Sequence, residues 1–192
     1  MRPTKSLPGF ESPAVGFEQP FEMLSACHDR VRRSLFLLVR LQGHVTNHGV
    51  DEQAKQAATD VLRYFNVAAP AHHEDEERHI VPALMQSEDA DLRAAANRIL
   101  IDHARISSAW TDLAPFLRLV EAGHRPDRQQ FVQAVDRFVR VHEDHLALEE
   151  NVAFPGARAH HESCGQAAVA AIGQEMAQRR TARKPVAVAE AS

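Results

Sequence analysis

A short motif occurs twice in this chain of 192 residues. Residues 72–82 read HHEDEERHIVP and residues 145–155 read HLALEENVAFP, so each copy begins with histidine and ends with proline. In both copies the first of two adjacent glutamates follows the histidine by four residues, and corresponding positions of the two copies are 73 residues apart. A repeat of this kind indicates that one structural unit has been used twice. The chain is therefore expected to consist of two similar halves.

The histidine and the first glutamate of each copy have the spacing of about one helical turn. Residues four apart lie on one face of an α-helix, with Cβ atoms roughly 5–6 Å apart. His72 and Glu76, and likewise His145 and Glu149, can therefore offer an imidazole nitrogen and a carboxylate oxygen to one point. Clustered charge near a helix end is more simply interpreted as a solvated surface when it occurs once. Because the pair occurs twice, we interpret the two pairs as parts of a metal site.

Composition restricts the class of protein. With 44% hydrophobic and 25% charged residues the chain fits one globular domain, and its eight glycines and abundant Ala, Leu, Arg and Glu favour helices. A net charge of −4 without a long Lys/Arg block argues against nucleic acid as a partner. No apolar run reaches the ~18–20 residues of a membrane span or resembles a signal peptide. Cys27 and Cys164 have the spacing of neither a disulfide framework nor a zinc motif. We expect an all-α protein of the cytoplasm that does not enter a membrane, and no protein partner is indicated.

Helical periodicity and turn residues predict four helices. Residues 1–20 contain four prolines and two glycines and are expected to form an extended N-terminal arm, and Pro20 suits a helix start. Residues 21–155 are predicted to form an up-down-up-down four-helix bundle, with breaks near 43–49 and 122–127. Pro70 is expected to kink the second helix or to force a locally irregular turn just before the repeated motif. Pro82 is expected to limit the second helix, and Pro115 to help end the third. Residues 156–192 are expected to form a short C-terminal helix and a tail.

Two further histidines interrupt apolar stripes. His28 in the first helix and His103 in the third stand where an apolar residue would be expected. A lone inward histidine is more often a hydrogen-bonded core residue than a ligand. However, His28 precedes His72 by 44 residues, and His103 precedes His145 by 42. Each half is therefore predicted to be a helical hairpin that contributes one histidine from its first helix and a His/Glu pair from its second.

Six inward side chains make up the predicted metal site. A buried glutamate is costly unless it is paired or bound to a metal. Nitrogen and oxygen donors without thiolate favour iron, and manganese, zinc or a mixed pair would also fit. Six residues are too many for one open tetrahedral site and too few for two closed octahedral sites, so we expect a dinuclear centre with open positions. The predicted ligands are His28, His72, Glu76, His103, His145 and Glu149.

The order of these residues resembles the hemerythrin-like, or HHE cation-binding, domain. The shared pattern is His, HxxxE, His and HxxxE, with Glu-Glu and a proline in each pair's segment, over roughly residues 20–155. The segments ACHDRVRRSL and VLRYFNVAAPAHHEDEE resemble a bacterial group within the family. The resemblance implies a four-helix bundle, two Fe ions in a non-heme di-iron centre held by the six residues, and binding or sensing of O₂, NO, peroxide or iron.

The chain departs from the oxygen-carrying hemerythrins at two positions. They have a second histidine where this chain has Ser107, and an aspartate where it has Glu150. Reversible O₂ carriage is therefore not expected. We favour a binding protein and assign no catalytic residues, and the alternative is a di-iron enzyme that acts on peroxide or NO. A metal-free helical interaction domain would leave the two buried glutamates unexplained.

The remaining polar residues of interest have less specific assignments. His73, next to His72, is predicted to be a seventh ligand, a partner of a ligand, or an exposed residue. Glu77 and Glu150 are expected to contact ligands or solvent, and Cys27 to be a buried, inert thiol. The other histidines are expected at the surface: His44, His48, His79, His124, His142, His160 and His161.

Overall fold

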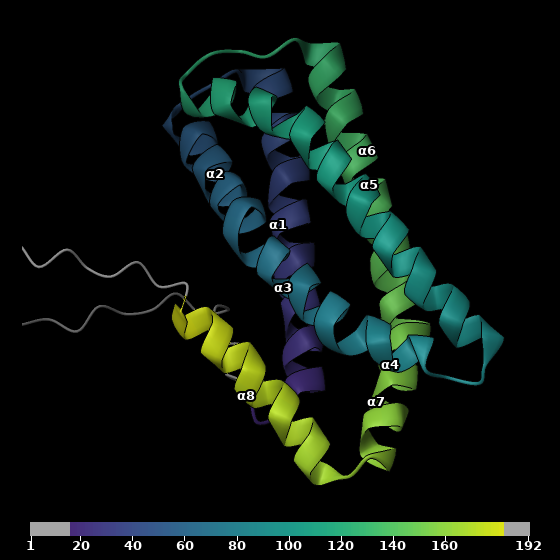
Figure 1. Cartoon of the computed structure of the whole chain (residues 1–192). Helices are drawn as coiled ribbons and strands as arrows, with labels where there is room; N and C mark the ends of the chain where they lie inside the picture. The colour runs from purple at the N-terminus through teal and green to yellow at the C-terminus, as the bar shows by residue number, and fades with distance from the viewer. Residues whose placement is uncertain (1–15, 183–192) are drawn as a thin grey trace, which may run out of the picture.

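The computed structural model describes residues 16–182, which form helices and contain no strand (Figure 1). The all-α prediction is therefore confirmed over this range. Most of the predicted N-terminal arm, residues 1–15, lies outside the described residues, and so does the end of the predicted tail, 183–192. Within the described range, no helix is both long and apolar enough to cross a membrane.

A proline, a glycine and an aspartate set the two ends of the first helix and the start of the second. Helix α1 (Pro20–His48) begins with proline, whose missing N–H costs no helical hydrogen bond in the first turn. It ends at Gly49, whose φ of 97° lies in the left-handed region that glycine adopts without strain. Helix α2 (Glu52–Arg63) then begins after Asp51, whose carboxylate accepts a hydrogen bond of 2.8 Å from the backbone N–H of Ala54.

Three π-helical turns interrupt the helices that carry the repeated motif. Segments η1 (Tyr64–Ala68), α3 (Ala69–Asp75), η2 (Glu76–Ile80) and α4 (Val81–Met85) continue α2, and η3 (Glu149–Ala153) joins α6 (Arg128–Leu148) to α7 (Phe154–Ser163). A proline, at position 70, 82 or 155, stands six residues after the first residue of each π turn. Proline lacks an N–H, and its ring collides with the carbonyl four residues earlier. A wider turn relieves that collision.

The prolines behave differently from the predictions in two places. The local irregularity expected before Pro70 is present as η1, but the helix continues past Pro82 to Met85. Helix α5 (Ala90–Glu121) also continues through Pro115 and ends six residues later. In both cases the surrounding packing offsets the loss of one helical hydrogen bond.

Four helical rods enclose the core: α1, the run α2–α4, α5, and the run α6–α7. Helix α1 packs against α2 and α6, and α5 packs against the same two helices. Figure 1 shows the rods side by side, with α8 (Gln166–Ala182) outside them at the end where α1 begins. Helix α8 contacts α1 and α7, and inserts Ile172 and Met176 among buried residues of that end.

The buried apolar residues form two clusters. The first cluster includes Val31 and Ile106, and the second includes Leu24 and Ile99. His28 lies between Leu24 and Val31 in the sequence of α1, and a buried histidine of α5 lies between Ile99 and Ile106 in the same way. A buried polar layer therefore separates the two apolar clusters.

Candidate metal centre

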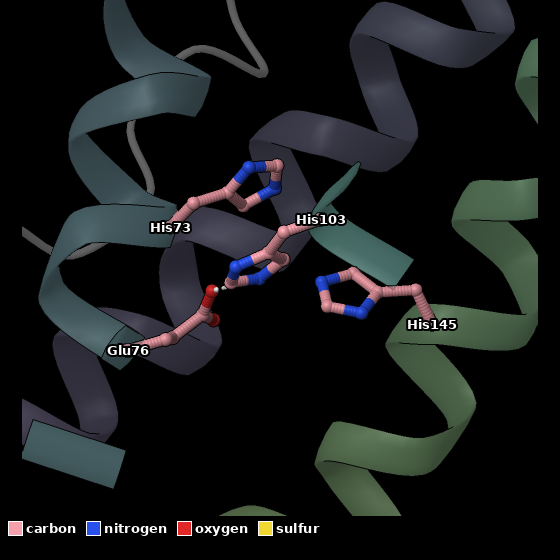
Figure 2. Close-up of side chains that lie close together, drawn as sticks. All are labelled: His73, Glu76, His103 and His145. Atoms are coloured by element: carbon pink, nitrogen blue, oxygen red, sulfur yellow. Dashed lines mark ion pairs between the residues drawn. The ribbon is translucent and has the colours of Figure 1, made fainter. Parts of the chain in front are cut away.

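All six predicted ligands lie in this polar layer, and each is at most 5% exposed. Together with His73 they form two groups of four, in which the potential ligand atoms of each group lie within 4.8 Å of one another. Glu76 belongs to both groups. Site A consists of His28, His72, Glu76 and Glu149, and site B, shown in Figure 2, consists of His73, Glu76, His103 and His145.

Glu76 lies between the two sites. His72 precedes it by four residues in α3, and Nε2 of His72 is 3.0 Å from Oε1 of Glu76. The other carboxylate oxygen, Oε2, is 3.3 Å from Nε2 of His103 on α5. One carboxylate thus approaches an imidazole of site A with one oxygen and an imidazole of site B with the other.

Glu149 has an equivalent position on the opposite rod. Its Oε1 is 3.2 Å from Nε2 of His145, four residues earlier, and its Oε2 is 3.1 Å from Nε2 of His28. Glu76 and Glu149 are each the first residue of a π turn, η2 and η3 respectively. Single π turns of this kind often occur at functional sites. Each carboxylate therefore has one oxygen near an imidazole of site A and the other oxygen near an imidazole of site B.

The second glutamate of each copy orients a histidine of the other half. Glu77 accepts a hydrogen bond of 2.7 Å from Nδ1 of His103, and Glu150 accepts one of 2.9 Å from Nδ1 of His28. Arg32 donates to the remaining oxygen of Glu150 at 2.6 Å. With the proton on Nδ1, the Nε2 lone pair of each histidine faces the site. Of the two alternatives expected for Glu77 and Glu150, contact with a predicted ligand is therefore the one observed.

The inner face of the site consists of polar atoms without hydrogen bonds. Among the described residues, Nε2 of the four predicted histidines and both oxygens of Glu76 and Glu149 are buried and make none. Each such atom costs about 1–3 kcal/mol when it is left unsatisfied. Coordination to metal ions would satisfy them together, and a set of imidazole and carboxylate donors suits iron. The residues present therefore fit a dinuclear metal centre.

The ionisation states of the buried groups also favour bound metal ions. Burial and, after it, the neighbouring carboxylate of Glu76 raise the pKa of Glu149 to about 7. Burial also opposes the charge on Glu76, but His72 and the other imidazoles around it hold its pKa well below the usual range. Burial lowers the pKa of His145 to about 3, so this imidazole is neutral and able to donate. Cations between the two carboxylates would remove their mutual repulsion.

His73 brings a fifth imidazole to the site. Its ring stacks on that of His103 with the centroids 4.1 Å apart, and lies 5.6 Å from the ring of His145 (Figure 2). Burial, followed by the charge of His103, lowers its pKa well below the usual value, so the ring is a neutral donor. Of the three alternatives left open by the sequence, the geometry favours a ligand. Ser107, where oxygen carriers have their extra histidine, is exposed one turn along α5.

Several other histidines were wrongly expected at the surface. His142 is only 2% exposed, donates from Nδ1 to the carbonyl of Phe138 at 2.9 Å, and has a pKa lowered by burial to about 4. Its position four residues after Phe138 continues the apolar stripe of α6 and was the signal for burial. The side chain of His79 is 14% exposed and pairs with Glu175 of α8, and His161 donates to the carbonyl of His79. Helix α8 thus covers His79 through Glu175, and His161 packs against the ring of Phe21.

An α-helical bundle with two adjacent groups of buried His and Glu side chains defines a class of metal-binding bundle proteins. The sequence model of the hemerythrin HHE cation-binding domain matches residues 19–173, so the chain belongs to this family. The resemblance inferred from the repeated motif is confirmed. The chain is also 30% identical to an uncharacterized protein of Haemophilus influenzae over 134 residues, which cover 70% of this chain and 76% of that protein.

Proposed function

We propose that this protein holds two non-heme iron ions in sites A and B and uses them to bind or sense a small molecule such as O₂, NO or peroxide. The observation that carries the proposal is the pair of buried donor groups that share Glu76. A single structural metal would need only one such group. Two groups joined by a carboxylate are the arrangement expected for a dinuclear centre.

The donors divide unequally between the proposed ions. Site A offers two imidazoles, site B offers three, and Glu76 and Glu149 each have one oxygen near an imidazole of either site. Site A therefore offers fewer imidazoles than site B, and a metal held there would leave more room for an external ligand. Iron bound here would supply one-electron redox chemistry and would accept an external ligand at the open positions.

The protein residues around the proposed ions have separate tasks. Glu77 and Glu150 hold His103 and His28 in the tautomer that presents Nε2 to the site. The two apolar clusters, one on each side of the polar layer, exclude water from it.

We also propose that the bundle has up-down-up-down order, which the packing of α1 and α5 against both α2 and α6 supports. Free thiols at Cys27 and Cys164 support our proposal of a cytoplasmic protein.

Elemental analysis tests the proposal most directly. Protein purified after expression in iron-replete medium is expected to contain about two iron ions per chain, and to show near-ultraviolet charge-transfer absorption after aerobic oxidation. Titration with azide or NO should perturb that absorption, because open positions remain. Stoichiometric zinc without iron would contradict the redox function, and one metal ion per chain would contradict the dinuclear centre.

A further inference from the structure

A cavity of about 230 Å³ lies between the η1–α3 segment and α5 and reaches site B at His73. Its walls are largely apolar and include three aromatic side chains, Phe65, Trp110 and Phe138. Ser107 and Thr111, both exposed, place hydroxyl groups along it on the side of α5. The cavity therefore joins solvent-exposed positions to a side chain of the candidate metal centre.

The walls of the cavity are held in place before any ligand arrives. The indole Nε1 of Trp110 donates to Oδ1 of Asn66 at 3.0 Å, which ties α5 to η1. The ring of Trp110 lies 5.3 Å from that of Phe65 and 5.3 Å from that of Phe138. A preformed apolar pocket with a few polar groups is typical of small-molecule sites, because little ordering remains to oppose binding.

The size and lining of the cavity restrict what it can bind. Among the described residues that line it there is no Asp, Glu, Lys or Arg, so a charged molecule would lose its hydration without compensation. Water occupies about 30 Å³ per molecule in the liquid. A diatomic molecule would therefore leave most of the 230 Å³ empty. A molecule with several non-hydrogen atoms would use the aromatic walls.

We propose that this cavity binds a neutral short-chain organic molecule with one terminal hydroxyl or hydroperoxyl group. Its apolar chain would pack against Phe65, Trp110 and Phe138, and its polar end would meet His73. The polar end of such a molecule would lie beside a side chain of site B, whereas diatomic ligands need no cavity of this size. The inference rests on the proposed function only for what the polar end approaches, and binding itself is independent of the metal.

Trp110 is the only tryptophan of the chain, so its fluorescence reports directly on the cavity. Titration of the metal-free and the metal-loaded protein with 1-butanol is expected to give a saturable change in emission. A dissociation constant in the millimolar range is expected, because affinity per non-hydrogen atom is limited. Butyrate, which has a similar chain and a charge, is expected to give no saturable change. Equal affinity for butyrate would overturn the neutral class of ligand.

Two adjacent serines of α5 provide a matched pair of variants. Ser107→Phe would place a ring at the cavity, and Ser108→Phe would place the same ring at an exposed position that does not line it. The first variant is expected to weaken butanol binding by at least ~10-fold, and the second to leave it nearly unchanged, since only the first removes pocket volume. Circular dichroism checks the fold of both. Equal butanol affinity in the two variants would contradict the proposal.

A second measurement needs no variant. Saturation of the butanol methyl resonance is expected to transfer magnetisation to the Trp110 indole in the unaltered protein, and absence of transfer at saturating butanol would overturn the proposal. Iron analysis of the same samples separates the two claims. Butanol binding in a protein that takes up no iron would leave this inference standing and refute the proposed function. Iron uptake without butanol binding would refute this inference and leave the proposed function standing.

Discussion

The two copies of the repeated motif have the same local backbone and different surroundings. In residues 72–82 and 145–155 a regular helical turn joins histidine to glutamate, a π turn begins at that glutamate, and a proline follows six residues later. Both copies place a carboxylate between sites A and B. In both copies the same local backbone thus brings one carboxylate oxygen near an imidazole of each site.

Neither copy completes its own half of the site. Glu77 of the first copy orients His103 of the second half, and Glu150 of the second copy orients His28 of the first half. The two hairpins therefore exchange hydrogen bonds across the polar layer. A hairpin on its own would lack the hydrogen bond that orients its first histidine, and its glutamate would have no imidazole of the other half beside it.

The copies differ at two positions that decide their environments. His73 corresponds to Leu146, which packs in the first apolar cluster. Asp75 corresponds to Leu148 and is fully buried, where it accepts hydrogen bonds from Arg179 and Arg180 of α8. The first copy therefore gains a third imidazole for site B and a docking point for the C-terminal helix. The second copy gains neither.

The largest difference between the copies is expected from their bridging glutamates. Glu76→Ala removes a donor that both groups share, so it is expected to lower iron affinity at both sites by more than ~100-fold. This loss exceeds the roughly 10–100-fold expected when a residue that only contacts a metal ligand is removed. Glu149→Ala removes one of the four donors of site A, whereas at site B it removes only the oxygen near His145 and leaves the four grouped donors in place, so it is expected to retain about one iron per chain. Iron per chain, measured on folded protein, distinguishes these outcomes. Equal losses would mean that the two carboxylates are equivalent.

His73→Leu gives the first copy the residue that the second copy has at the corresponding position, Leu146. Site B would lose one of its three imidazoles, so we expect its iron affinity to fall by about 100-fold while site A keeps its metal. The exposed His124→Leu serves as a control and should change neither site. Stepwise iron-binding curves measure both affinities. Unchanged binding in His73→Leu would show that this imidazole is not a ligand.

Asp75→Leu likewise gives the first copy the residue that the second copy has at the corresponding position, Leu148. Removing one partner of a buried ion pair can cost ~3–5 kcal/mol, but the arginines here are 15% and 30% exposed, so we expect about 2 kcal/mol. Urea unfolding measures this loss, and hydrogen exchange should show it in α8 first. The surface pair Asp112–Arg137 provides the control, since Asp112→Leu should cost less than ~1 kcal/mol. Equal losses would show that Asp75 does not anchor α8.

The smallest effects are expected from the outer glutamates. Glu77 and Glu150 are 46% and 35% exposed, so water can partly replace each, and we expect about a 10-fold loss of iron affinity per alanine substitution. Glu77→Ala should weaken site B and Glu150→Ala should weaken site A, because their histidine partners lie in different groups. Competition with a graded series of chelators resolves the two steps. Weakening of one and the same site by both variants would contradict the exchange between hairpins.

Much of the site could be predicted because its spacing is local. A spacing of four positions from histidine to glutamate places both on one helical face, and a histidine within an apolar stripe points inward. The six residues that were predicted as ligands on these grounds all lie in the polar layer. His142 shows the limit of the same argument, because it also continues an apolar stripe and is buried without belonging to either site.

Other features depend on contacts between distant segments. The assignment of His73 required the position of His103, which lies on another rod 30 residues later. The burial of Asp75 and the cover over His79 required α8, which is about 100 residues away in sequence. The cavity beside Trp110 is lined by aromatic rings from three rods, so it forms only when the rods pack together.

The sequence by itself determined that this chain is helical, that a motif is used twice, and that six inward donors accompany it, because helix periodicity and the i, i+4 relation act within a few residues. Tertiary structure decided which carboxylate oxygen faces which imidazole, that Glu76 belongs to both sites, and that His73 joins site B. These results depend on how rods far apart in sequence pack against one another, and side-chain packing across a core is not encoded in local spacing.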